Sequence, residues 1–210
     1  MNFIEENVFS IITAIIAIIA LWQTHRQIKI SNKHQLFNKR VEKFMLISGL
    51  MSLFKQSKTL MKKENYNSFI DVTMLFHSLT NNTYLKAVRN IIDNIYQEDI
   101  RQNFLVKLEE LKRISVEVEF LFSKINIKLI QDFIYEYQEL LRKIYEEQII
   151  LYKIMEANRE NPTAFTKLQK EFGEKKYREK LYSEYDKIKS LYDEVVKKDI
   201  MKNIKKQIKF

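Results

Sequence analysis

The sequence predicts an all-α protein, and three observations lead to that prediction. The 210 residues include only two Gly and one Pro, whereas sheets joined by tight turns need many of both. Apolar side chains recur three and four positions apart along most of the chain, which is the spacing of one helical face. One stretch near the start of the chain, residues 8–22, is predominantly apolar and carries no charge. We therefore expect an N-terminal transmembrane helix that continues into a long stalk helix, then a cytoplasmic helical bundle and a long C-terminal amphipathic helix.

The apolar stretch, residues 8–22, lies within eighteen consecutive uncharged residues, 7–24. A helix of that length reaches roughly 27 Å, which is about one hydrocarbon thickness. Ile12, Ile15, Ile16 and Ile19 supply much of its apolar surface, and Trp22 suits the headgroup level at its end. These residues predict an uncleaved single-span anchor. A cleaved signal peptide or a buried helix is the alternative, although the acidic start does not fit a signal peptide.

The charges on the two sides of this stretch are unequal. Glu5 and Glu6 precede it without any basic residue. The first basic residues that follow it are Arg26, Lys29, Lys33, Lys39 and Arg40. Because cytoplasmic segments carry an excess of Lys and Arg, we expect an inner (plasma) membrane protein with its N-terminus outside and its body in the cytoplasm. These five residues are also predicted to contact anionic lipid, which is favoured over nucleic-acid binding.

Small side chains form a stripe on the predicted span. Ser10, Ala14 and Ala17 share a helical face with Thr13, while Ile residues cover the rest. Such stripes let helices approach closely in lipid, so this one predicts packing between spans of identical chains. The alternative is that Ala and Ser are simply common in helices of this kind.

The net charge of +9 divides the chain into four predicted parts. Residues 1–24 are the short N-terminus and transmembrane helix. Residues 25–63, with ten basic and one acidic side chain, form a basic juxtamembrane helix. Residues 64–160, with twelve basic and sixteen acidic side chains, form the helical bundle. Residues 161–210, with fourteen basic and eight acidic side chains, form a short helix and a long basic C-terminal helix.

Within the bundle, apolar spacing predicts a short helix at residues 69–79 and another that Asn82 or Thr83 caps. That second helix presents Leu85, Val88, Ile92 and Ile95 on one face. A longer helix after residues 97–99 is expected to bury Phe104, Leu108, Leu111, Ile114, Val118 and Leu121. The next helix, running to about Ala157, is expected to bury Ile130, Phe133, Tyr137, Leu141, Ile144, Leu151 and Ile154.

The C-terminal part begins with Asn161 and Pro162, which predict a helix cap and a first helical position. Gly173 predicts the end of that short helix, and a long charged helix then runs to the end of the chain. Its final turns form a basic amphipathic tail that includes Lys202, Lys205 and Lys206. A solvated helix end is the favoured interpretation, followed by membrane contact and then RNA backbone contact.

No group of residues predicts a reaction. The chain has no Cys and three His, and no two His or Glu and His have the spacing of a helical metal site. His77 lies alone on an apolar helix, where we expect a core residue that either has satisfied hydrogen bonds or is half-exposed. Glu146 and Glu147 are interpreted as part of a solvated helix face. We therefore predict that the protein is not an enzyme and uses no cofactor or metal.

One segment carries a resemblance. The run QIKISNKHQLFNKRVEKF, residues 27–44, follows an N-terminal span and resembles the neck of uncharacterised single-span membrane proteins of low-GC bacteria. The architecture is similar to small membrane accessories and effectors of phage defence, including the helical partners of type VI-B CRISPR systems. Those partners are described as having a divergent version of the helical RNase fold, whose motif is an Arg, four to six further residues and then a His. Here the nearest match, Arg26 to His34, has seven residues between the two, so the resemblance does not carry RNase activity over.

Two hypotheses about function follow. The first is a homo-oligomeric membrane effector or accessory of antiviral (phage) defence that acts on membrane permeability. The alternative is a monomeric or dimeric inner-membrane tether whose cytoplasmic bundle binds a protein or RNA partner, although no residue pattern supports nucleic acid specifically. A membrane-held nuclease with an unusual motif is a third and weaker hypothesis.

Overall fold

The structure is a computed structural model that describes residues 3–58, 69–122, 126–160, 162 and 165–208. These residues form seven α-helices, one 3₁₀-helix and no strand, so the all-α fold class is confirmed. In chain order the helices are α1 (Phe3–Ser57), α2 (Phe69–Leu79), η1 (Lys86–Ile92), α3 (Glu98–Leu121), α4 (Ile127–Glu160), α5 (Phe165–Glu171), α6 (Glu174–Lys197) and α7 (Ile200–Gln207).

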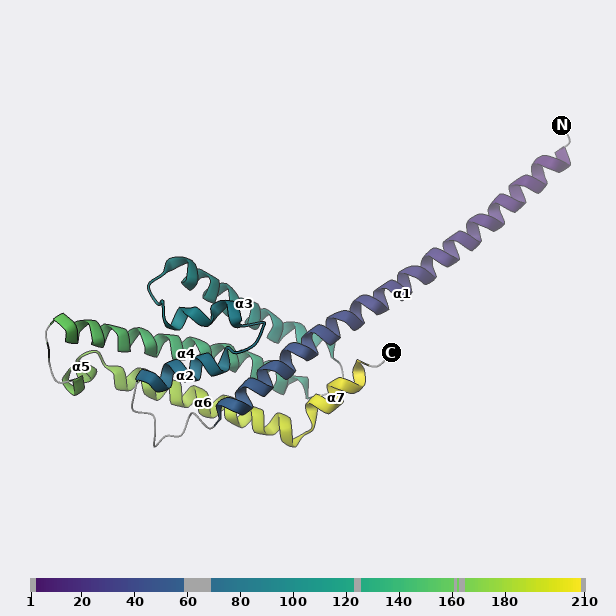
Figure 1. Cartoon of the computed structure of the whole chain (residues 1–210). Coiled ribbons are helices and arrows are strands. Elements are labelled where there is room, and N and C mark those ends of the chain that lie inside the picture. The colour runs from purple at the N-terminus through teal and green to yellow at the C-terminus, as the bar shows by residue number, and fades with distance from the viewer. Residues whose placement is uncertain (1–2, 59–68, 123–125, 161, 163–164, 209–210) are drawn as a thin grey trace.

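Helix α1 is a single helix of 55 residues and dominates the shape of the molecule. At 1.5 Å per residue it is roughly 83 Å long. Its N-terminal part projects away from the body, and its last turns enter the body (Figure 1). The predicted continuity between the apolar stretch and the following segment is therefore confirmed, because no Pro interrupts the helix.

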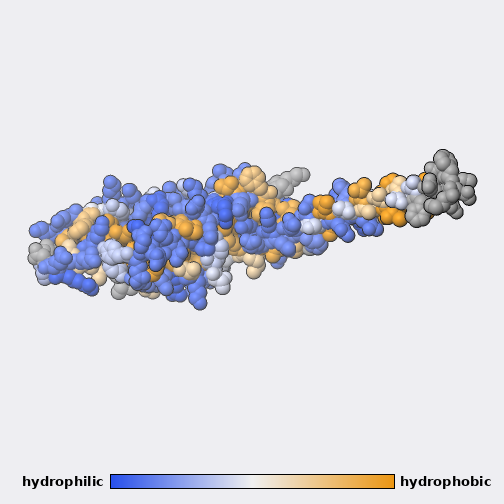
Figure 2. Space-filling view, turned by 90° about the horizontal axis from the view of Figure 1, so that it is seen from above, coloured by the Kyte–Doolittle hydropathy of each residue, from blue (hydrophilic) through white to orange (hydrophobic). Residues whose placement is uncertain are grey.

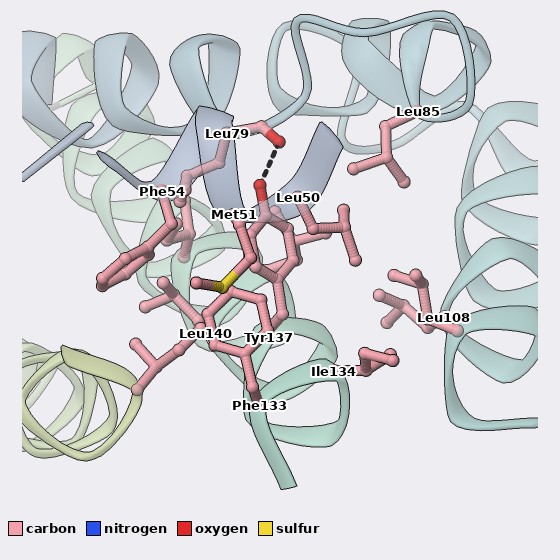
Figure 3. Close-up of a cluster of buried hydrophobic side chains, with 14 of the residues drawn as sticks. Leu50, Met51, Phe54, Leu79, Leu85, Leu108, Phe133, Ile134, Tyr137 and Leu140 are labelled. Carbon is pink, nitrogen blue, oxygen red and sulfur yellow. Dashed lines mark hydrogen bonds between the residues drawn. The ribbon is translucent and has the colours of Figure 1, made fainter. Parts of the chain in front are cut away.

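The body is a bundle in which α4 packs against α6 on one side and against α3 on another. Helix α2 and the end of α1 cover α4 (Figure 1). The core gathers side chains from these helices, with Phe54 of α1 against Phe133 of α4 at 6.1 Å between ring centroids (Figure 3). Every apolar residue predicted to be buried on α3 and on α4 is buried. The spacing of apolar residues was sufficient to identify these faces because both helices are long and regular.

The segment after α2 differs from the prediction in its helix type. The predicted cap is wrong as well, because the N-cap of η1 is Leu85, which makes no side-chain cap hydrogen bond. Asn82 Oδ1 instead accepts a 2.8 Å hydrogen bond from the Leu85 N–H, in the turn that precedes the helix. The helix itself is a 3₁₀-helix rather than an α-helix. Its repeat of three residues places Leu85, Val88 and Ile91 in one buried row.

The predicted long C-terminal helix is also interrupted. Asp199 adopts a left-handed conformation, with φ of 51°, and separates α6 from α7. Asp tolerates this conformation better than most residues. The break turns Ile200 and Ile204 into the core, where both are buried. The predicted cap Asn161 and the boundary between residues 63 and 64 lie outside the described residues. Pro162 is not the first helical position as predicted, because it is not helical and α5 begins at Phe165.

Candidate membrane and assembly surface

We call the projecting N-terminal part of α1, up to Lys39, the arm. Over residues 10–36 the rest of the protein does not cover it. Every side chain described in residues 10–36 is exposed. The exposed fractions of Ile12, Ile15, Ile16, Ile19 and Trp22 lie between 49% and 61%. Figure 2 shows apolar side chains on this arm beyond the polar body. Among the described residues, one helix, Ser10–Ser57, is long and apolar enough to cross a membrane, and by length and composition it fits a single span or a signal sequence.

The stripe of small residues forms a shallow hollow on the arm. Ser10, Thr13, Ala14 and Ala17 line this hollow, which is open to the surroundings. The hollow arises because the side chains of Ala and Ser are much shorter than those of the neighbouring Ile residues. The structure thus places the predicted packing residues Ser10, Ala14 and Ala17 together on one face.

The five basic residues predicted to contact lipid divide into two groups. Four of them lie on the arm, whereas Arg40 contacts the body. The Arg26 guanidinium lies over the Trp22 ring, 5.7 Å from its centroid. Lys29, Lys33 and Lys39 are exposed on the arm. These lysines lie on a helix whose sequence has no acidic residue between Glu6 and Glu42.

Arg40 has a role that the sequence did not indicate. Its Nε donates a 2.7 Å hydrogen bond to the carbonyl of Leu121, at the end of α3. One of its terminal nitrogens donates a 3.4 Å hydrogen bond to the carbonyl of Gln207, at the end of α7. These carbonyls lack partners within their own helices, so a cation suits both positions. Arg40 therefore joins the arm to two helix ends and is half-buried there, instead of projecting freely as a lipid contact would.

The basic tail is amphipathic, as predicted, and one face of it is built into the body. Ile200 and Ile204 are buried, whereas Lys202, Lys205 and Lys206 are exposed. The contact between Gln207 and Arg40 holds the end of α7 beside α1. Helix α7, which carries the three lysines, thus lies beside α1 near the point where the arm leaves the body (Figure 1).

His77 is partly exposed, with 25% of its side chain accessible, and both ring nitrogens have polar neighbours. His77 Nδ1 accepts a 3.1 Å hydrogen bond from Arg89, and His77 Nε2 lies 3.4 Å from a carboxylate oxygen of Asp93. Burial lowers the pKa of His77, with Asp93 acting in the opposite direction. Among the described residues, no three His, Cys, Asp or Glu side chains are grouped as metal ligands would be.

Glu147 is the clearest correction to the sequence analysis. Its side chain is fully buried rather than part of a solvated face. It faces Glu174, the first residue of α6, which is only 3% exposed. Burial and the proximity of Glu174 raise the pKa of Glu147 to about 9, so this carboxyl is protonated at neutral pH.

A second acidic pair lies on the same interface between α4 and α6. Burial and then Glu184 raise the pKa of Glu136 to about 7, and the Lys187 ammonium lies 3.1 Å from Glu184.

One sequence signal was available for the burial of Glu147, because this residue continues the apolar ladder on α4. That ladder comprises Phe133, Tyr137, Leu140, Ile144, Glu147, Leu151 and Ile154.

Comparison with known proteins adds no relative. No protein-family model, curated protein or solved structure matches the chain.

Proposed function

We propose that this protein is a single-span membrane effector that assembles with copies of itself through the hollow on its arm. The observation that carries the proposal is the exposure of residues 10–36. An apolar helix that the protein itself does not cover needs another apolar environment, and lipid supplies it. The unequal flanking charges favour an outside N-terminus and a body in the cytoplasm.

The length of the arm predicts which basic residues reach lipid. Measured along the helix from Thr24, Lys29 lies roughly 8 Å away, Lys33 roughly 14 Å and Lys39 roughly 23 Å. The headgroup layer is roughly 5–8 Å thick, and charges act over roughly 8 Å beyond it at physiological salt. In an upright arm, Arg26 and Lys29 therefore lie among headgroups, Lys33 lies within range of them, and Lys39 lies beyond.

The same length separates the basic tail from the bilayer. Because α7 meets α1 at Arg40, the tail lies roughly 24 Å from Thr24 along the arm. This spacing favours a solvated helix end over membrane contact for Lys202, Lys205 and Lys206. The body is then held clear of the membrane on a helical arm, where it is accessible to cytoplasmic partners.

Assembly is the step that distinguishes an effector from a simple anchor. The hollow at Ser10, Thr13, Ala14 and Ala17 lets the backbone of another helix approach closely, which strengthens dispersion contacts in lipid. Several spans packed in this way would bring their cytoplasmic bodies together and change the permeability of the membrane. A role in antiviral defence rests on the architectural resemblance described above.

The experiment is the mass of the full-length protein in mild detergent, corrected for bound detergent, for the native chain and for an Ala14→Leu, Ala17→Leu variant. We expect several subunits for the native protein and a smaller assembly for the variant, because Leu fills the hollow. An Ile15→Leu, Ile19→Leu variant changes the opposite face and is expected to match the native mass. A native monomer, or an assembly that the Ala14 and Ala17 changes leave intact, would refute the proposal.

A second candidate function, a tether for a partner protein, is favoured by a groove between α3 and α4. Val106, Arg113 and Val116 of α3 line it, and so does Gln138 of α4. Gln138 is 5% exposed, and its Oε1 has no hydrogen-bond donor in the described part of the protein. A monomeric or dimeric mass together with a co-purifying protein would favour this function over the first.

A further inference from the structure

The end of the body farthest from the arm is held by a hydrophobic cluster of its own. Ile150 and Ile154 of α4 and Leu168 of α5 form its buried centre, and Phe172 and Tyr177 pack against it. Helix α5 lies at this end (Figure 1) and contributes one buried side chain, Leu168. Opening this end would expose far less apolar surface than unfolding the body, because the main core is a separate cluster.

Glu147 lies at the boundary between the two clusters. Its neighbour in the apolar ladder, Leu151, belongs to the main core, whereas Ile150 belongs to the small cluster. Both carboxyl oxygens of Glu147 are buried without a hydrogen-bond donor among the described residues. Ionised carboxylates only accept hydrogen bonds, so two adjacent carboxyls satisfy each other only when one carries a proton.

Glu174 approaches from the other side of this boundary. It is the first residue of α6 and follows Gly173, whose φ of 65° forms the turn from α5. The Arg178 guanidinium lies 3.2 Å from Glu174 and compensates for one negative charge. A second negative charge at this buried position would have no partner there.

We propose that α5 and the first turn of α6 form a flap, which a proton shared by Glu147 and Glu174 holds closed against α4. When that proton leaves, two carboxylates face each other at a buried interface. The flap then opens and hydrates them, while the main core stays folded. Detaching the first turn of a helix breaks only the hydrogen bonds that its carbonyl groups accept, because its N–H groups have no partners within the helix. This inference concerns the end remote from the span and does not depend on how copies assemble.

The electrostatic surroundings of the pair are simple. Glu174 and Arg178, both on α6, are the charged groups that act on Glu147 among the described residues. The other elements that pack against α4, namely α1, α2, η1, α3 and α5, contribute no charged group that acts there, within the described part of the chain. Burial is the main cause of the raised pKa of Glu147, Glu174 reinforces it, and Arg178 opposes it.

The proposal makes a quantitative prediction about the flap. The closed state holds one more proton than the open state between the ordinary pKa of 4.5 and about 9. The equilibrium constant for opening should therefore rise about ten-fold for each pH unit in that range. The rise should be absent in Glu147→Gln, because the amide keeps the shape of the side chain, donates to Glu174 and does not ionise.

The test uses the full-length protein in mild detergent between pH 7 and 9. The native chain has no cysteine, so single cysteines can report opening through their rate of reaction with a thiol reagent. Leu168→Cys reports the flap, Ser115→Cys reports the main core, and the exposed Lys167→Cys corrects for the titration of the thiol itself. Hydrogen exchange of the cysteine-free protein, corrected for its intrinsic pH dependence, measures the opening of α5 and the first turn of α6. This measurement requires no substitution in the core.

We expect the corrected thiol reaction rate of the Leu168→Cys variant to rise about 50-fold from pH 7 to 9, because Glu147 is half ionised in the closed state at the upper end of this range. No such rise is expected in the Ser115→Cys variant, or when Leu168→Cys is combined with Glu147→Gln. Hydrogen exchange should rise over the same range in α5 and the start of α6.

A flat rate in the Leu168→Cys variant together with flat hydrogen exchange would overturn the proposal. So would a rise that persists when Glu147→Gln is added. An equal rise in the Ser115→Cys variant would also overturn it, because that result would indicate opening of the whole body.

Discussion

Removal of one buried hydroxyl tests how the body is held together. Tyr137 is fully buried on α4, and its hydroxyl donates a 2.6 Å hydrogen bond to the carbonyl of Leu79 at the end of α2 (Figure 3). Carbonyls in the last turn of a helix have no partner within that helix. Tyr137→Phe removes the donor while leaving the ring in place, so the Leu79 carbonyl stays buried without a partner.

The magnitude follows from that unpaired carbonyl. A buried acceptor left without a donor costs about 1–3 kcal/mol, whereas the loss of the hydroxyl creates little empty space. We therefore expect Tyr137→Phe to lower the free energy of unfolding by about 1–3 kcal/mol. This corresponds to a folded-to-unfolded ratio that falls by about 5-fold to 150-fold.

The assay is urea unfolding of the full-length protein in mild detergent, followed by circular dichroism. Tyr152→Phe is the matched control, because the Tyr152 hydroxyl lies 3.5 Å from the carbonyl of Asp93 at an exposed position. The control should change the free energy of unfolding by less than about 0.5 kcal/mol. If Tyr137→Phe costs no more than Tyr152→Phe, the reasoning from the buried carbonyl is wrong.

Two further predictions concern the junction of the arm and the second acidic pair. Arg40→Ala should lower the free energy of unfolding by about 1–2 kcal/mol and speed hydrogen exchange in α7. The control Lys39→Ala, at an exposed position, should do neither. Equal effects of the two substitutions would argue against the role given to Arg40. Burial and Glu184 raise the pKa of Glu136 to about 7 in the folded protein, from an ordinary 4.5. The stabilisation from this proton is therefore complete below pH 4.5 and is lost as the pH rises through 7. Glu136→Gln should flatten that part of the stability profile in the same urea assay, and an unchanged slope would contradict the assignment.

The sequence by itself determined the helices and most of their buried faces. Low Gly and Pro content excluded a sheet built on tight turns, and the spacing of apolar residues identified the buried side of α3 and α4. Helix α2 was predicted with its observed bounds, and the left-handed Gly173 ends the short helix as expected. The arm and its small-residue stripe were also visible in the sequence. These features depend on neighbours within a few positions along the chain, which is the range over which helical periodicity acts.

Only the tertiary structure decided what Arg40, Glu147 and Asp199 do. Arg40 bonds to Gln207 across 167 positions of the sequence, so its role depends on where α7 folds back. Glu147 and Glu174 have ordinary helix-forming side chains and become a pair because α4 and α6 pack against each other. Asp199 breaks the last helix so that Ile200 and Ile204 reach a core that other helices build. A local pattern specifies which side of a helix is apolar, but the burial and charge of a given side chain depend on the element that packs opposite it.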